Sequence, residues 1–298
     1  MLKPKQRFVP YALIVPFLLF WLTFVIYPVF KNLFMSLTQW GVSTGYVKFV
    51  GLRNYRYIFD PKNNFLGKQF WSALWVTIQY LFYSVPVFVG ASLALALAVN
   101  SQNLGKSRSI FRTLFFLPVC LPITVVATIW RWIFMYSGVA NYIIGIFGAA
   151  QVPWLTQLPG VWVSIIVATL WGTVGFNMII LIGGLQSIPQ ELYDAAYVDG
   201  ANGYQRLIHI TLPQLMPVLL FVLITQILGS FNLFAQPQLM TAGGPGRSTL
   251  PIMYFIYQKA FGATANLMGF SSAAATVTTL IIAAVIVAWY TLFSRRTD

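Results

Sequence analysis

The stretch VWVSIIVATLWGTVGFNMIILIGGL, residues 161–185, decides the fold class. It contains no Asp, Glu, Lys, Arg or His, and it exceeds the roughly 20 apolar residues that a helix needs to cross the hydrocarbon core of a bilayer. Such a stretch indicates a transmembrane helix.

Comparable stretches occur on both sides of it. The whole chain is 58% hydrophobic and 8% charged, whereas a soluble domain carries about 25% charged residues. Breaking the longest apolar stretches at their Gly, Pro and Asn clusters predicts six spans, near residues 9–34, 70–99, 113–135, 161–185, 213–234 and 266–293. The sequence therefore predicts an all-α membrane protein with six transmembrane helices.

Three regions are predicted along the chain. They are an N-terminal span with its outer loop (1–69), a core of five spans (70–293) with a cytosolic loop at 188–213, and a short tail (294–298). With the N-terminus inside, the inner loops and termini hold nine basic residues and the outer loops seven, so the positive-inside rule favours cytosolic N- and C-termini. Orientation in the membrane explains the net charge of +13 better than binding to nucleic acid does.

The outer connections have their own signals. Tyr57 and Phe59 predict a short interfacial helix in the loop at 37–68, with aromatic rings at the depth of the headgroups. The glycines and prolines of 137–160 predict a re-entrant or surface-lying helix rather than a span, and 241–246 is predicted to be a turn.

Residues needed for several activities are missing from the sequence. No Gly-x-x-x-x-Gly-Lys-Ser/Thr string occurs, so any ATP-driven step, with its nucleotide and Mg²⁺, is assigned to another polypeptide. The spans hold almost no ionisable side chain for an ion relay, and no paired carboxylates, metal-spaced His cluster or Ser/His pair for catalysis. We expect no catalytic residue, metal or cofactor. An importer subunit, an ion-driven carrier or channel, and a membrane enzyme stay open, and only the last two would work as isolated chains.

The cytosolic loop carries most of the functional signal. Pro189 suits the first turn of a helix, acidic residues favour its N-terminal end, and Gly200 can take the left-handed conformation that ends it. We predict a short helix, a break and a second short helix that ends at Pro213, forming a stiff knob that inserts into a cleft on a partner. An ordinary amphipathic connector between two spans is the alternative. The coupling residues of this knob are Glu191, Asp194, Ala195, Ala196, Asp199, Gly200, Ala201 and Pro213.

The same loop resembles the coupling loop of binding-protein-dependent ABC importer permeases. Asp194-Ala195-Ala196, then Gly200, then Ile210-Thr211-Leu212-Pro213 reproduce the family spacing of Glu-Ala-Ala, Gly and Ile-x-Leu-Pro, with Asp194 where Glu is usual. Weaker likenesses along the chain, among them residues 49–55 and 243–245, point to the carbohydrate-uptake branch that includes the larger membrane subunit of the maltose importer.

The resemblance implies a set of partners. They are a second permease subunit, two ABC ATPase subunits that receive the coupling helices, an extracytoplasmic solute-binding protein, a sugar substrate and the lipid of a prokaryotic cell membrane. A polyol, glycerol phosphate or another small solute is the alternative cargo. An anionic cargo would want a basic residue in the cavity, and none is obvious.

Substrate contacts also follow from the resemblance, through an ungapped alignment from the coupling loop. The positions are Thr169, Thr173 and Phe176 in the fourth span, and Gln226, Gly229, Ser230 and Leu233 in the fifth, with Asn232 beside them. Their spacing places each set on one helical face, and hydroxyls, amides and an aromatic ring suit a sugar. Hydrogen bonding between helices is the alternative role for these polar residues.

Overall fold

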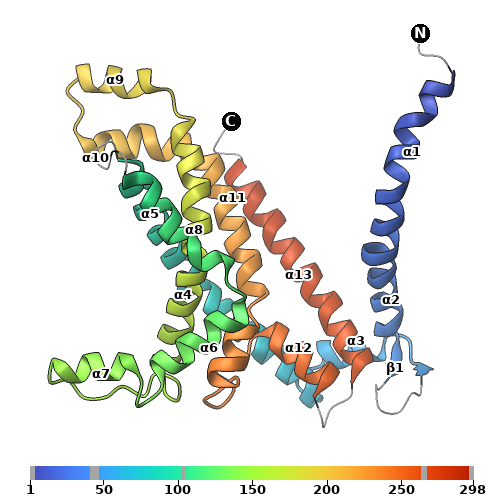
Figure 1. Cartoon of the computed structure of the whole chain (residues 1–298). Coiled ribbons are helices and arrows are strands. Elements are labelled where there is room, and N and C mark those ends of the chain that lie inside the picture. The colour runs from blue at the N-terminus through green and yellow to red at the C-terminus, as the bar shows by residue number, and fades with distance from the viewer. Residues whose placement is uncertain (1–3, 41–46, 102–104, 106, 263–266, 295–298) are drawn as a thin grey trace. The chain divides into compact units, whose positions relative to one another are not determined.

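A computed structural model describes residues 4–40, 47–101, 105, 107–262 and 267–294 of the chain. These residues are mostly helical (Figure 1), and their one sheet has two strands of three residues each. Within this part of the chain, six helical stretches are long and apolar enough to cross a membrane. The predicted all-α fold with six spans is confirmed.

The chain forms two compact units. The first comprises Met1–Trp71 and Phe255–Ala283, and the second comprises Ser72–Tyr254 and Ala284–Asp298. The last span thus begins in the unit that contains the first span, a pairing that the sequence did not predict. Residues 295–298 of the predicted tail lie outside the described residues.

The first unit begins with one long helical span. Its elements are α1 (Pro4–Trp21), η1 (Leu22–Ile26), α2 (Tyr27–Ser36), β1 (Thr38–Trp40), β2 (Val47–Phe49) and α3 (Arg53–Phe59), followed by the first turns of α4 (Phe65–Asn100) and by parts of α12 (Ile252–Phe261) and α13 (Met268–Ser294). Strands β1 and β2 pair antiparallel, with Thr38 opposite Phe49. The helix predicted in the outer loop is present as α3.

Buried Asn54 holds the hairpin of this unit in place. Its Nδ2 donates hydrogen bonds to the carbonyls of Ser36, the last residue of α2 (2.8 Å), and of Thr38, the first residue of β1 (2.9 Å), which satisfies two backbone acceptors. A Cβ at Gly269 of α13 would overlap the Thr38 carbonyl, so only glycine allows this close approach. The small residues 271–274 that follow it are buried, as close helix packing requires.

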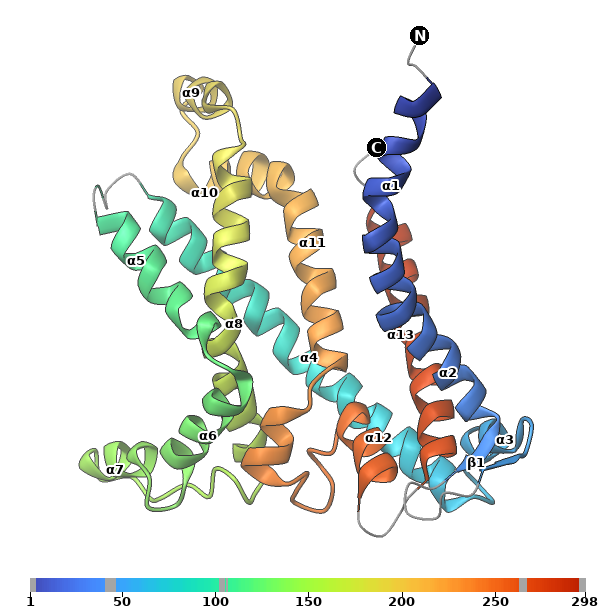
Figure 2. The same cartoon turned by 45° about the vertical axis from the view of Figure 1, so that its right-hand side comes forward.

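The second unit contains most of the spans, the connection between α6 and α8, and the connection between α8 and α11. After α4 come α5 (Ser107–Phe116), η3 (Leu117–Cys120), α6 (Ile123–Phe134), α7 (Val139–Ile146), α8 (Gly160–Gln186), α9 (Gln190–Val198), α10 (Gly203–Arg206), η4 (Leu207–Thr211), α11 (Leu212–Phe231) and η5 (Pro237–Thr241). Helices α7 and α9 flank α8 in sequence and lie at its opposite ends (Figures 1 and 2).

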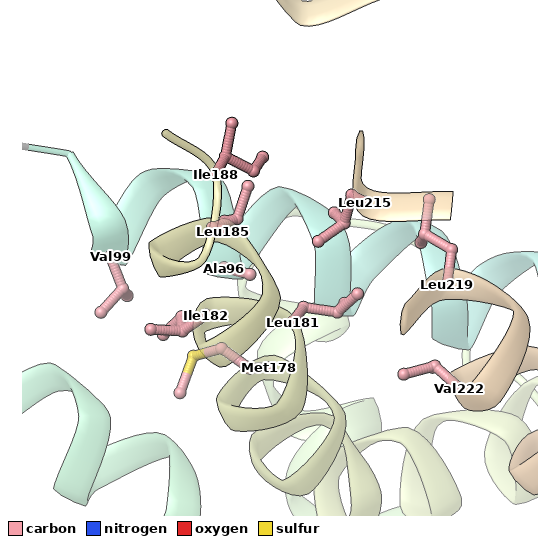
Figure 3. Close-up of a cluster of buried hydrophobic side chains, with 10 residues drawn as sticks. All are labelled: Ala96, Val99, Met178, Leu181, Ile182, Leu185, Ile188, Leu215, Leu219 and Val222. Atoms are coloured by element: carbon pink, nitrogen blue, oxygen red, sulfur yellow. The ribbon is translucent and has the colours of Figure 1, made fainter. Parts of the chain in front are cut away.

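Helices α4, α8 and α11 share an apolar core (Figure 3). Its buried side chains are Ala96 and Val99 of α4, Met178, Leu181, Ile182 and Leu185 of α8 with Ile188 after it, and Leu215, Leu219 and Val222 of α11. A Cβ at Gly184 would lie 2.7 Å from Leu215 Cδ1, so α8 and α11 pack closely because position 184 is glycine. This core supports the base of the loop at 188–213.

The third predicted span is not one straight helix. The chain passes from α5 through the 3₁₀ turn η3 and an extended Leu121 before α6 begins after Pro122. Pro118 and Pro122 lack amide hydrogens and cannot continue the α-helical hydrogen-bond ladder, so the predicted 113–135 helix is broken. A second break at 135–138 separates α6 from α7, which turns aside (Figure 2).

The outer segment at 241–246 is a turn, as predicted. Ala242 and Gly243 have φ angles of 51° and 82°, and the buried Thr249 hydroxyl donates to the Gly244 carbonyl (2.7 Å). The same hydroxyl lies 2.7 Å from that of Thr241, so the turn is closed by hydrogen bonds.

Candidate coupling surface and translocation site

Helix α9 forms the first half of the predicted knob. It ends in a Schellman motif, in which the Gly200 amide donates to the Tyr197 carbonyl (3.1 Å) and the Ala201 amide to the Ala196 carbonyl (2.9 Å). Gly200 has a φ of 77°, the left-handed conformation that the sequence predicted for it. The end of the helix is therefore sharply defined.

The second half of the knob continues into a span. Asn202 and Gln205 form a capping box, with bonds of 2.9 Å and 2.8 Å, and the chain then stays helical through α10, η4 and α11 as far as Phe231. The prediction that the second helix ends at Pro213 is wrong. Pro213 lies in the first turn of α11 directly after a π-helical turn, where a missing amide is tolerated.

Side chains tie the two halves together. The Tyr193 hydroxyl of α9 hydrogen-bonds with the Thr211 hydroxyl of η4 at 2.9 Å. The Arg206 guanidinium lies over the Tyr197 ring, 6.0 Å from its centroid. These two contacts join α9 to the helix that becomes α11.

The knob has a notch with a mixed polar and apolar lining, beside a cluster of exposed apolar side chains. A cavity of about 330 Å³ is lined by Ala196, Asp199, Gly200, Ala201, Gln205, Arg206, His209 and Ile210. Beside it, Tyr197, Val198 and Tyr204 are 72%, 85% and 71% exposed. Of the predicted coupling residues, Glu191, Asp194, Ala195, Asp199, Gly200 and Pro213 are exposed, and Ala196 and Ala201 are half-buried. Clustered exposed apolar side chains mark a contact surface.

The α8 set of predicted substrate residues is partly accessible. Thr169 and Thr173 are half-buried and Phe176 is exposed. The Thr173 hydroxyl donates to the Thr169 carbonyl (2.8 Å), while the Thr169 hydroxyl accepts a bond from Gln236 Nε2 (3.1 Å). The α8 set thus has both a polar and an aromatic surface on one face.

The α11 set divides into buried and exposed members. Gln226 Nε2 donates to Asn177 Oδ1 of α8 (3.1 Å), and Gly229 is exposed. The buried Ser230 hydroxyl donates to the Gln226 carbonyl (2.8 Å) and lies 3.5 Å from the hydroxyl of Ser84 of α4.

Of the two predicted residues that follow α11, Leu233 is buried and Asn232 is exposed. Leu233 packs in a buried cluster with Tyr80, Phe88 and Ile165, so it contributes to the core rather than to an open surface. Asn232 is exposed, and its Nδ2 donates to the Leu228 carbonyl (2.9 Å).

Two polar residues of this region were missed by sequence reasoning. Ser84 and Gln236 bond to predicted positions, and with Thr169, Asn177, Gln226 and Ser230 they form what we call the polar seam. The signal was present, because Ser84 is a polar residue inside an apolar span. Their partners lie 146 and 67 residues away, a pairing that only the fold reveals. Asn177 Nδ2 is buried without a partner among the described atoms, so the seam has unused hydrogen-bonding capacity.

An apolar groove lies apart from the polar seam. It has a volume of about 510 Å³, and its lining includes Phe111, Leu114, Trp130 and Trp171. None of the polar seam residues lines it. Trp171, which lies two residues after Thr169 on α8, contributes to this groove instead. Within the described residues, no group of three or more His, Cys, Asp or Glu could hold a metal ion.

Comparisons with known proteins assign the chain to a family. Residues 87–298 match the family model described as binding-protein-dependent transport system inner membrane component. The chain is 35% identical to the probable ABC transporter permease protein YurN of Bacillus subtilis over 93% of each chain. It is 34% identical to the arabinooligosaccharides transport system permease protein AraP of the same organism, over 93% of this chain and 86% of the relative.

Further matches agree with this family and with the fold. Identity to the trehalose/maltose transport system permease protein MalF of Thermococcus litoralis is 34%, over 84% of this chain and 83% of the relative. A bacterial alginate ABC transporter, solved with an alginate pentasaccharide-bound periplasmic protein, matches with a TM-score of 0.83 at 22% identity, over 99% of this chain and 96% of that chain. The chain therefore belongs to the binding-protein-dependent ABC transporter permeases, inner-membrane transport subunits that act with a binding protein and an ATPase and are not themselves enzymes.

Proposed function

We propose that this chain is one of two permease subunits of an ABC importer, that it carries a sugar or oligosaccharide, and that the knob of α9, α10 and η4 docks into an ATPase subunit in the cytosol. In this arrangement both termini are cytosolic and nucleotide and Mg²⁺ are bound by the ATPase. The binding protein delivers substrate at the opposite face.

The continuity between the knob and α11 is the observation that carries the coupling role. A force on α9 reaches η4 through the hydrogen bond between Tyr193 and Thr211. From η4 the backbone is helical without interruption to Phe231, past Gln226 and Ser230 of the polar seam. ATP binding can drive transport only if it stabilises one conformation more than the other, and a stiff connection transmits that difference.

Surface chemistry supports the ATPase as the partner of the knob. Tyr197, Val198 and Tyr204 expose apolar area that a cleft could bury, and the notch next to them could receive a side chain from the partner. Interfaces of this kind draw affinity from aromatic side chains that fill pockets.

A neutral sugar suits the polar seam better than an anion does. The seam offers hydroxyls and amides, which pair with sugar hydroxyls, and it contains no Lys or Arg that would stabilise a phosphate. Phe176, 47% exposed on the same face of α8, supplies an aromatic plane for a sugar ring. Relatives named for arabinooligosaccharides, trehalose and maltose, and lactose support this class of cargo. A polyol stays the alternative.

Gly200→Arg tests the coupling role. A Cβ at Gly200 meets no atom within 4 Å, so arginine has space there and its cation blocks docking, while the φ of 77° adds only local backbone strain to a protein that should still insert. The matched control is Gly51→Arg, because Gly51 also has a positive φ (58°) and an open Cβ position but lies in the outer loop. We expect ATPase subunits to co-purify with the Gly51 variant and not with the Gly200 variant. Equal co-purification would refute the docking site.

Cargo is tested separately by direct binding. The purified binding protein of the same importer is titrated with neutral oligosaccharides, a polyol and glycerol phosphate, and uptake of each by reconstituted importer is measured with Gln226→Ala and with the parent chain. A sugar preference that Gln226→Ala weakens supports the proposal. Uptake of only the phosphate ester would overturn the proposed cargo and leave the ATPase role intact.

A further inference from the structure

Helix α7 turns an apolar stripe away from the protein. Its large side chains recur at the i, i+3, i+4, i+7 and i+8 positions of an amphipathic helix. All of these are exposed, namely Val139 (57%), Tyr142 (73%), Ile143 (48%), Ile146 (66%) and Phe147 (83%). In an amphipathic surface helix the apolar face normally packs on the core. In α7 the large apolar side chains point away from the core instead.

The opposite side of α7 is fixed to the protein. Asn141 is 2% exposed, and its Nδ2 donates to the carbonyls of Tyr136 (3.0 Å) and Val152 (2.9 Å). Its Oδ1 accepts from the Val152 amide (2.9 Å) and from Trp154 Nε1 (3.1 Å). Four hydrogen bonds from one side chain hold α7 in this orientation, so the stripe cannot turn inward without breaking them.

The position of α7 in the chain places it at a membrane surface. It connects α6, the last part of the broken third span, to the spanning helix α8, and it projects sideways from them (Figures 1 and 2). The stripe continues onto exposed apolar side chains at the ends of those helices, Trp132 before α7 and Leu158 before α8. The apolar surface of the spans therefore extends onto α7.

Charge favours lipid over a protein or water as the neighbour of the stripe. From Trp132 to Gln190 the sequence contains no Asp, Glu, Lys or Arg, so the connection has no charged side chain to pair with a partner protein or to remain in water. Exposed Trp132 and Tyr136 shortly precede the helix, and such aromatic residues concentrate where acyl chains meet headgroups.

We propose that α7 is an interfacial helix that lies in the bilayer on the side of the membrane opposite α9, with its apolar stripe among the acyl chains and Asn141 toward the protein. The partner is the phospholipid surface itself. Because α7 is bonded rigidly to the connection between α6 and α8, it sets the depth of these two segments in the bilayer.

Spin labels on the assembled importer in lipid nanodiscs test this proposal. The background carries Cys120→Ser, which removes the one cysteine of the chain, and cysteine-free partner subunits. Nitroxides are attached at Ile143→Cys and Phe147→Cys in the stripe and at Gly145→Cys as the control. Gly145 is exposed, its Cβ position is open, and two residues of helix place it on nearly the opposite side from both.

Collision rates decide the outcome. Oxygen concentrates in lipid and a nickel chelate stays in water, so we expect oxygen collisions to dominate at 143 and 147 and nickel collisions to dominate at 145. Nickel collisions that dominate at 143 and 147 would show a wet stripe, and labels that neither reagent reaches would show a protein cover. Either result overturns the proposal, and retained ATP-driven uptake confirms that the labelled importers are assembled.

Discussion

Asn141→Ala should release the connection between α6 and α8. The side chain links the carbonyl of Tyr136, both backbone groups of Val152 and the indole of Trp154, with bonds of 2.9 to 3.1 Å. All four bonds are lost in the alanine variant, and the helix α7 loses its anchor.

The magnitude follows from the number and setting of these bonds. A neutral hydrogen bond contributes about 1 kcal/mol net. Tyr136 is exposed, so its carbonyl can bond to water instead, and three bonds remain to be counted. The local structure should lose about 3 kcal/mol, which corresponds to a roughly 100-fold rise in the population of the open connection.

Hydrogen exchange measures this opening directly. Amides of α7 and of Val152 in the purified importer should exchange roughly 100-fold faster in Asn141→Ala, while those of α9 stay unchanged. The control is Asn63→Ala, because the exposed Asn63 side chain bonds only to the Asp60 carboxylate, and the expected effect is within about 0.5 kcal/mol. A change of less than about tenfold at α7, equal to 1.4 kcal/mol, would refute the anchoring role.

Three further variants test other contacts. Gly200→Ala should destabilise the Schellman motif by about 1–2 kcal/mol because the φ of Gly200 is 77°. It should therefore retain less ATPase in a pull-down than Gly200→Asn, because asparagine tolerates this conformation. Equal retention by the two variants would contradict a role for the turn. Gly269→Ala should lower the midpoint of thermal unfolding, because its Cβ overlaps the Thr38 carbonyl and overpacking costs about 1–3 kcal/mol. Gly90→Ala is the control and should leave the midpoint unchanged, because its Cβ has open space around it. Equal midpoints for the two variants would count against the close approach at Gly269. Tyr193→Phe should speed hydrogen exchange in α9 by removing its bond to η4, worth about 1 kcal/mol, and unchanged exchange would show that the bond does not hold the knob.

The sequence predicted those features of the fold that depend on local patterns. Five of the six predicted stretches became continuous helical spans because apolar length determines whether a helix can cross the bilayer, and the third, at 113–135, is broken at Pro118 and Pro122. Gly200 adopted the predicted left-handed conformation because the helix before it ends with glycine at the C′ position. Signals that act within a few residues are readable without a structure.

Features that depend on distant contacts were not readable. The paired strands at 38–40 and 47–49 have three residues each, too few for a strand pattern, and they are held by Asn54 and by the close approach of Gly269. Ser84 and Gln236 contact the predicted substrate positions only because α4 and η5 fold against α8 and α11. The breaks at Pro118 and Pro122 were visible as prolines, but apolar length favoured one span.

The wrong prediction at Pro213 has a mechanical consequence. A helix that ended there would leave a joint between the knob and the fifth span, and movement at the cytosolic surface could be lost in that joint. The observed helix from Gly203 to Phe231 removes the joint, and at 1.5 Å per residue its path from Gly203 to Gln226 is about 35 Å, comparable to the thickness of the hydrocarbon core. The helix bends where η4 passes into α11 (Figures 1 and 2), so we expect a tilt of the knob to reach α11 through this bonded bend as a displacement with a changed direction. Because Gln226 bonds to Asn177 of α8, that displacement must either carry α8 with it or break the polar seam, and both outcomes change the surface that we propose for sugar binding.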